Sequence, residues 1–324
     1  DAKRFAEDVL GKGVVIARDV PNFIANRIGC FGLLEAIRAM EEFDLGPDEV
    51  DSVAGVAMGR SRSASFRTLD LIGLDVFLDV CGNMPDEDDV PSHAGFDVPI
   101  VVRDLIFRNW LGEKTGMGFY KRQQVGTSKE VFALDLKSMD YRPRRSLIAE
   151  SLSAVRKMSD PMARLGTLVE SDDIAGKLTW RILASTLAYS AWQIGRAADD
   201  VISVDRALRW GFSWDIGPFE AWDALGVTAT TRRIQNDGLK LPSWVEKMAD
   251  SNGSFYDPVG HNGTQRFGVN QSVTNGQQRV SISGHMPVAK WPGATIFDID
   301  DGIAYLDFHS PKQAIGRDML DAIA

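Results

Sequence analysis

The chain contains a weak internal repeat that spans most of its length. Segment 27–51 begins with an arginine and ends with an aspartate, and segment 181–205 has the same ends and the same length. Segment 66–74 then aligns with 219–227 once a gap of one residue is allowed. Each copy reads as a long helix, a short helix, a loop and a further helix. Because two copies are too few for a solenoid, we predict two similar helical bundles that pack face to face, as subunits of a homodimer would.

The spacing of apolar residues gives the expected fold class. It predicts long helices over residues 23–43 and 174–198, and one further helix over 64–81. Asn22 is placed to cap the first of them. We therefore expect a mainly α fold of two helical-bundle repeats packed on each other. A short buried strand at residues 13–17 precedes them, and β-hairpins follow near the C-terminus, where an Asp-Asp-Gly turn lies at 300–302.

The overall composition excludes several classes of partner. A formal net charge of -9 over 324 residues disfavours nucleic acid and anionic membrane as partners. No apolar run approaches the roughly 20 residues that span a bilayer. The two cysteines form no disulfide framework, and Cys30 lies in an apolar helical run, which predicts a buried thiol. A reducing, cytoplasmic location fits these features.

Motifs that carry chemistry by themselves are absent from the sequence. No Gly-x-Gly-x-x-Gly turn follows a strand, and no phosphate-binding loop or nucleophile elbow is present. The four histidines are scattered, so we expect no metal site. The tryptophans fall mostly at helical spacing and predict core packing. The basic run at 142–145 reads as a solvated linker rather than an anion site.

Three motifs, in order, carry a resemblance to a known family. Residues 19–27 follow the pattern Asp-x-Pro-x-Phe-x-x-Asn-Arg, residues 69–75 read Leu-Asp-Leu-Ile-Gly-Leu-Asp, and residues 112–120 follow Gly-x-Lys-Thr-Gly-x-Gly-Phe-Tyr. These stretches closely resemble the C-terminal, helical part of 3-hydroxyacyl-CoA dehydrogenases. Residues 215–223 repeat a family-like stretch in the second copy. The final residues resemble the opening hairpin of an enoyl-CoA hydratase (crotonase) domain.

The resemblance implies a domain organisation. Its expected segments are 1–20, the end of a dinucleotide-binding domain; 21–122, the first helical repeat; 123–145, a linker; 146–250, the second helical repeat; 251–293, a Gly/Asn-rich linker or hairpin; and 294–324, the start of a crotonase-like domain. The implied parent is a multifunctional β-oxidation protein that oxidises 3-hydroxyacyl-CoA to 3-ketoacyl-CoA. NAD would be bound by the dinucleotide-binding domain, with no cofactor on this chain.

The resemblance also gives candidate site residues. Asn26 matches a substrate-side polar group of the family, and its carboxamide can stabilise charge that develops on the substrate. We expect it exposed at the open edge of the first repeat, with Phe23, Ile24 and Ile28 turned into the core. The alternative is an asparagine that binds backbone at a helix start. Lys114 is a weaker candidate for a CoA phosphate, since a lysine in a closing loop is more often structural.

Two readings of the function remain at this level. The first is the substrate-side piece of a dehydrogenase, inactive alone and monomeric, whose partners are acyl-CoA and the nucleotide-binding and hydratase domains of the same protein. The second is a non-catalytic helical interaction module that keeps the fold. Residues 59–62 depart from the Gly-Pro-rich loop of the family, so the shape of the acyl pocket stays open.

Overall fold

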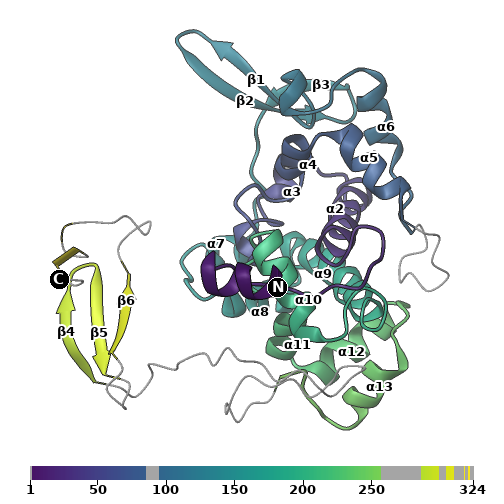
Figure 1. Ribbon diagram of the computed structural model, residues 1–324. Coiled ribbons are helices and arrows are strands. Elements are labelled where there is room, and N and C mark those ends of the chain that lie inside the picture. The colour runs from purple at the N-terminus through teal and green to yellow at the C-terminus, as the bar shows by residue number, and fades with distance from the viewer. Residues whose placement is uncertain are drawn as a thin grey trace. The chain divides into compact units, whose positions relative to one another are not determined.

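The structure is a computed structural model that describes residues 2–84, 95–256, 286–298, 304–309, 317 and 320–321. Within these ranges the chain forms two compact units, one of the residues up to Tyr256 and one of those from Met286 onward. The first unit is mostly helical and carries one small sheet, whereas the second is built on a small sheet (Figure 1). The helical unit agrees with the mainly α class that the sequence predicts.

Two long helices form the centre of the first unit. Helix α2 (Ala25–Glu42) and helix α9 (Ile174–Trp192) pack against each other, which confirms that the two predicted long helices meet (Figure 1). The ring of Phe31 on α2 stacks on that of Tyr189 on α9, with centroids 4.2 Å apart and planes 18° from parallel. Both rings are fully buried, so this pair adds contact energy to the apolar area removed from water.

Shorter helices surround each long helix. Helices α3, α4 and α5 contact α2, and α6 contacts α5. Helices α7, α8, α11 and α12 contact α9, while α10 contacts α11 and α13 contacts α12. Their bounds are α3 (Pro47–Asp51), a 3-10 helix (Val56–Met58), α4 (Phe66–Ile72), α5 (Leu74–Gly82), α6 (Ile100–Phe107), α7 (Glu150–Val155), α8 (Pro161–Glu170), α10 (Val201–Gly211), α11 (Pro218–Leu225), α12 (Val227–Asn236) and α13 (Ser243–Asp250).

The single helix expected over residues 64–81 is wrong, because the chain breaks it at Gly73. This glycine has φ +96°, a conformation that L side chains rarely adopt, and it separates α4 from α5. Gly226 separates α11 from α12 in the same way, with φ +84°. A periodicity that continues through a glycine cannot reveal such a change of direction.

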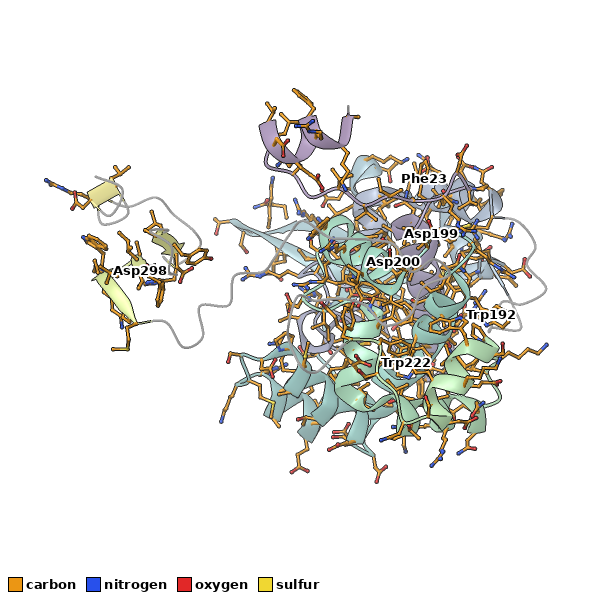
Figure 2. The ribbon with its side chains drawn as sticks, turned by 60° about the horizontal axis from the view of Figure 1, so that its bottom comes forward. Phe23, Trp192, Asp199, Asp200, Trp222 and Asp298 are labelled. Carbon is orange, nitrogen blue, oxygen red and sulfur yellow. The ribbon has the colours of Figure 1, made fainter. Side chains whose placement is uncertain are left out.

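Side-chain caps explain where several helices begin. The carboxylate of Asp200, labelled in Figure 2, accepts a hydrogen bond from the backbone N–H of Ser203 at 2.6 Å and so begins α10.

The side chain of Trp222, also labelled in Figure 2, is fully buried and packs against Phe219 and Phe255. Packing therefore explains this tryptophan, as the sequence predicts, whereas Trp210 is 49% exposed.

Two buried carboxylates hold the loops around α4. Asp51 accepts hydrogen bonds from the backbone N–H groups of residues 65–67 and from the Tyr120 hydroxyl, the latter at 2.8 Å. The first N–H groups of a helix have no partner inside it, so Asp51 satisfies those of α4. Asp70 accepts from the backbone N–H groups of Phe119 and Tyr120, each at 2.8 Å. Burial raises the pKa of Asp51 to about 6 and that of Asp70 to about 7.

The same arrangement occurs around α11. Asp205 accepts hydrogen bonds from the backbone N–H groups of residues 219–220 and from the Tyr256 hydroxyl, the latter at 2.6 Å. Asp223 accepts from the backbone N–H groups of Phe255 and Tyr256, at 2.8 and 2.9 Å. Burial raises the pKa of Asp205 to about 7.

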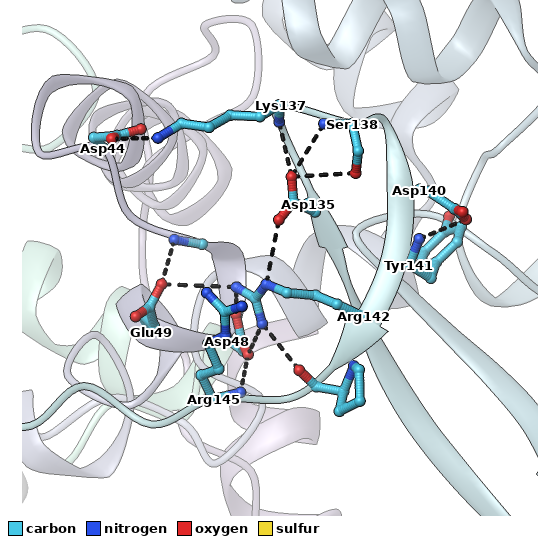
Figure 3. Close-up of polar contacts among 12 residues, drawn as sticks. Asp44, Asp48, Glu49, Asp135, Lys137, Ser138, Asp140, Tyr141, Arg142 and Arg145 are labelled. Atoms are coloured by element: carbon cyan, nitrogen blue, oxygen red, sulfur yellow. Dashed lines mark hydrogen bonds and ion pairs between the residues drawn. The ribbon is translucent and has the colours of Figure 1, made fainter.

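The region expected as a linker, 123–145, contains most of a three-stranded antiparallel sheet. Its strands are β1 (Tyr120–Val125), β2 (Ser128–Asp135) and β3 (Asp140–Pro143), in the order β1-β2-β3. The reading of the basic run 142–145 as solvated is wrong for Arg142, whose guanidinium forms a two-pronged pair with Asp48 at 2.9 and 2.9 Å (Figure 3). Asp48 is 1% exposed and also accepts from the backbone N–H of Arg145. This pair fastens β3 to α3.

The short strand expected at residues 13–17 is not present. The chain begins with α1 (Ala2–Arg4) and a π-helical turn (Phe5–Val9), and residues 11–18 are irregular. No described strand lies beside them to share backbone hydrogen bonds, and Ile16 is 63% exposed. An apolar run becomes a strand only where a neighbouring strand satisfies its backbone.

The second unit confirms the predicted hairpin strands. Strands β5 (Ala294–Asp298) and β6 (Ala304–Phe308) pair antiparallel, and β4 (Pro287–Trp291) pairs with the other side of β5. Strand β4 falls inside the region expected as a Gly/Asn-rich linker, 251–293. Residues 257–285 of that region, and the turn at 300–302, lie outside the described residues.

Two further sequence predictions concern the burial of Cys30 and the presence of membrane-spanning helices. Cys30 is a free, buried cysteine, and burial raises the pKa of its thiol to about 12. Among the described residues, no helix combines the length and the apolar character needed to cross a membrane.

Candidate functional site

The start of α2 places Asn26 at the surface. Ile24 and Ile28 are buried, at 2% and 0% exposure, whereas Asn26 is exposed. Phe23, labelled in Figure 2, is 57% exposed, so the expectation that it points into the core is wrong. Asn22 and Phe23 both have positive φ, 64° and 48°, and this turn before the helix directs the phenyl ring outward.

Asn22 does not cap α2. Its side-chain amide donates instead to the carbonyl oxygen of Val80 at 3.1 Å, and α2 has no side-chain cap. Asn26 makes no hydrogen bond within the described structure, so the alternative of an asparagine bonded to its own helix is not seen. Its carboxamide keeps both N–H donors and its oxygen available for a ligand.

Asn26 lines a cavity of about 340 Å³ between three parts of the first unit. The walls come from the exposed edge of α2, the loop before α4 together with α4 itself, and the segment after α10. The lining residues are Asn26, Gly29, Leu33, Arg60, Ser61, Ser63, Ala64, Ser65, Thr68, Ile72, Gly211, Phe212, Ser213 and Trp214. Hydroxyls and apolar groups therefore meet in one space beside Asn26.

Glycines on α2 let the other walls approach the helix. A Cβ at Gly29 would lie 2.2 Å from Cζ of Phe212, so a side chain there would displace the ring. A Cβ at Gly32 would lie 3.7 Å from Nη1 of Arg60, which places the guanidinium against the helix. The approach of Phe212 thus depends on Gly29, whereas a Cβ at Gly32 would make an ordinary contact with the guanidinium.

Arg60 is the charged residue in the lining of this cavity. It is 8% exposed, its Nη2 donates to the hydroxyl of Thr186 at a long 3.4 Å, and its guanidinium lies 4.5 Å from the ring centroid of Trp214. Burial lowers its pKa to about 10. The sequence reading missed this residue, although residues 59–62 were the stretch that departs from the family loop.

A larger cavity, of about 950 Å³, adjoins the first through shared residues. Arg60, Ser61, Ser63, Ser213 and Trp214 line both. The other lining residues of the larger cavity are Val56, Arg62, Ser159, Pro161, Arg164, Arg209, Trp210 and Asp215. Four arginines and one aspartate give this part of an acidic chain a positive lining.

Lys114, the weaker site candidate, is not brought to either cavity. Its ammonium pairs with the carboxylate of Asp75, and this hydrogen bond holds the pKa of Asp75 below its usual range. Both side chains are well exposed, at 43% and 40%. The pair joins the closing glycine-rich loop to α5, which agrees with a structural role for the lysine.

Comparison with known proteins now adds to this geometry. Residues 23–122, which contain α2 to α6 and Asn26, match the family model for the 3-hydroxyacyl-CoA dehydrogenase C-terminal domain. Over these residues the chain is therefore similar to that C-terminal domain. One wall of the cavity that Asn26 lines, residues 211–214, lies outside this domain.

Relatives extend over more of the chain. It is 39% identical over 98% of its length to the "Probable 3-hydroxyacyl-CoA dehydrogenase" of Bacillus subtilis (strain 168), and it covers 41% of that protein. It is 28% identical over 74% of its length to a Rickettsia felis protein whose name describes a fatty acid oxidation complex trifunctional enzyme, and covers 33% of it. The chain thus spans well under half the length of these two relatives.

A solved structure shares the fold. The crystal structure of 3-hydroxybutyryl-CoA dehydrogenase from Escherichia coli K12 superposes with a TM-score of 0.51, over 77% of this chain and 64% of that one, at 19% sequence identity. This likeness extends beyond the C-terminal domain of residues 23–122.

Proposed function

We propose that this chain forms the helical, substrate-side part of an NAD-dependent 3-hydroxyacyl-CoA dehydrogenase of fatty-acid β-oxidation. In this proposal the parent protein converts 3-hydroxyacyl-CoA to 3-ketoacyl-CoA. The observation that carries it is the exposed, unbonded Asn26 at the wall of a cavity, inside the domain that matches this family. The names of the relatives support the same reaction.

Asn26 acts in this proposal by positioning and by electrostatics. As the hydroxyl carbon of the substrate becomes a carbonyl, its oxygen changes from a hydrogen-bond donor and acceptor to an acceptor alone. The N–H of the Asn26 carboxamide can donate to this oxygen in both states, because a hydroxyl oxygen and a carbonyl oxygen are both acceptors. A donor fixed on a helix stabilises the developing charge without reorganising water.

The described residues do not fit an NAD site. A dinucleotide pyrophosphate is held by a glycine-rich turn between a parallel strand and a helix, and both described sheets are antiparallel. We therefore assign no residue here to NAD, and propose that a separate domain of the parent protein supplies hydride acceptor and general base.

Two further parts of the proposal concern the domains. The hairpin of β5 and β6 supports a crotonase-like domain that begins at residues 294–324, and the trifunctional relative supports a parent with several activities. The matching carboxylate networks of Asp51 and Asp205 support an internal duplication, residues 21–122 and 146–250, in which only the first copy carries a site asparagine.

The duplication predicts equal losses at two tyrosines. Tyr120→Phe and Tyr256→Phe each remove a hydroxyl that donates to a buried aspartate. Leaving a buried acceptor without its donor costs about 1–3 kcal/mol, so both should lower the free energy of unfolding by that amount and agree within about 1 kcal/mol. Urea denaturation measures this. Tyr141→Phe, which loses a bond to the carbonyl of Gly118, is the control. A loss at only one of the two positions contradicts equivalent networks.

The dehydrogenase proposal is tested with the chain and with its longer parent side by side. We expect NADH to form from NAD and 3-hydroxybutyryl-CoA with the longer protein, and none with the 324-residue chain, because the proposal assigns the general base and the hydride acceptor site to a separate domain. Turnover by the chain alone contradicts this division. Absence of turnover by the longer protein on any 3-hydroxyacyl-CoA favours the alternative, a helical interaction module.

A further inference from the structure

The guanidinium of Arg60 is a buried charge without a counter-charge. Its contacts within the described structure are the Thr186 hydroxyl and the Trp214 ring, and no carboxylate lies within ion-pair distance. An arginine carries five N–H donors and is charged at neutral pH even where burial lowers its pKa. Burying such a charged group away from water costs free energy unless an anion pairs with it.

The neighbouring acids do not fill this role. Asp215 is the one carboxylate in the lining of the larger cavity, and it accepts from Arg164 at 3.1 Å. Glu220 accepts from Arg209 at 2.7 Å. The positive charges of Arg164 and Arg209 are thus compensated, whereas no carboxylate among the described residues pairs with Arg60 or Arg62.

The groups around Arg60 suit an oxygen-rich ligand. The hydroxyls of Ser61 and Ser63 lie 2.8 Å apart, and the Thr68 hydroxyl donates to that of Ser63 at 2.7 Å. All three residues line the cavity beside Asn26. The Trp214 ring lies 4.5 Å from the guanidinium carbon of Arg60, and one hydrogen bond, to Thr186, uses the guanidinium N–H donors within the described structure.

We propose that Arg60 binds an oxyanion, a phosphate or a carboxylate, carried by the ligand that occupies the cavity beside Asn26. The planar guanidinium can offer two parallel N–H donors to either group. Arg62, exposed at the rim, adds attraction at longer range.

Two parts of an acyl-CoA could supply this oxyanion, and naming them rests on the proposed function. One is a phosphate of the CoA moiety. The other is a carboxylate at the far end of a dicarboxylic acyl chain, which would make Arg60 a determinant of acyl-group specificity. Binding of the oxyanion itself does not depend on dehydrogenase activity, so the two proposals can fail separately.

The experiment uses the contact between Arg60 and Trp214 as a reporter. The chain, labelled with fluorotryptophan, is titrated with inorganic phosphate, CoA, adipate and the neutral adipamide while fluorine NMR is recorded. The Trp214 resonance is assigned with Trp214→Phe, and the resonance of the buried Trp222 reports that the core is folded. We expect a saturable shift of the Trp214 signal with at least one oxyanion and none with adipamide.

The variants then assign the shift to Arg60. Arg60→Lys keeps the charge but loses the two-pronged geometry, and should raise the dissociation constant at least about 10-fold, as for the loss of a charge-assisted hydrogen bond. Arg122→Ala, on the exposed strand β1, is the control and should bind as the unmodified chain does.

Each outcome decides between the sources or rejects the site. A shift with phosphate and CoA alone assigns the phosphate source, and a shift with adipate alone assigns the carboxylate. No shift with any oxyanion, an equal shift with adipamide, or undiminished binding by a folded Arg60→Lys chain overturns the proposal. The adipate and adipamide comparison on the unmodified chain decides the matter even if Arg60→Lys does not fold.

Discussion

Replacing Asn26 with alanine in the longer protein is expected to lower dehydrogenase turnover by about 10- to 1000-fold, the range for the loss of one preorganised donor. The residue is exposed and makes no hydrogen bond in the chain. Its removal should therefore change the free energy of unfolding by no more than about 0.5 kcal/mol. Steady-state NADH formation and urea denaturation together separate the two effects.

A matched control keeps this test specific. Asn236→Ala, at the exposed end of α12, removes the same side chain from a helix outside both cavities and should leave turnover unchanged. If Asn26→Ala retains the full rate, Asn26 takes no part in catalysis and the chain contributes only shape to the active site. If turnover and the free energy of unfolding both fall, the loss of turnover is explained by lost folding, and Asn26 is again assigned no part in catalysis.

Glu35→Gln is expected to destabilise the helical unit by about 3 kcal/mol, because breaking a buried ion pair leaves an uncompensated charge. Glu35 on α2 is fully buried and accepts from Arg38 on its own helix at 2.5 Å and from Arg181 on α9 at 2.6 Å. The three groups thus join the two long helices across their interface. Glu42→Ala is the control, because Glu42 pairs with the same Arg181 at 2.8 Å but is 51% exposed. It should cost less than about 1 kcal/mol.

The effect of Glu35 should depend on pH in one direction. Burial alone would raise the pKa of Glu35, but Arg181 and Arg38 outweigh it and hold the pKa below the ordinary value of 4.5. A lowered pKa in the folded state contributes stability above pH 4.5, which is lost as the pH falls through the folded-state value. The difference in unfolding free energy between the unmodified chain and Glu35→Gln should therefore shrink below pH 4.5. A constant difference from pH 7 to pH 3 contradicts the ion-pair explanation.

The helical part of the fold was predictable where periodicity was long. The spacing of Ile28, Leu34 and Ile37 marks a buried face that the structure confirms as fully buried. Elements fixed by a distant partner were not predictable. Arg142 reads as a solvated cation until its neighbour Asp48, brought close only by the fold, is known. The apolar run at 13–17 likewise lacked the neighbouring strand that the prediction assumed.

For the site, the sequence predicted a position but not its surroundings. Asn26 is predicted as a site residue by a motif whose spacing this chain retains, and its exposure agrees with that prediction. Arg60 belongs to no recognised motif. It stands out only through its contacts with Trp214 and Thr186, which are far away in the sequence. A buried cation without a partner is a property of the folded chain, and no pattern in one sequence reports it.

The way in which Asp51 and Asp205 hold their loops bears on how such a protein can diverge. In the loops at residues 65–67 and 219–220 both carboxylates accept from backbone N–H groups, and their side-chain donors, Tyr120 and Tyr256, lie outside these loops. Mutations in the preceding loops can therefore accumulate without loss of the anchor, because every residue except proline offers the same N–H. The two loops are free to specialise, one toward the cation of Arg60 and the other toward the aromatic face of Trp214, and new ligand preferences could arise there while the helices beneath stay unchanged.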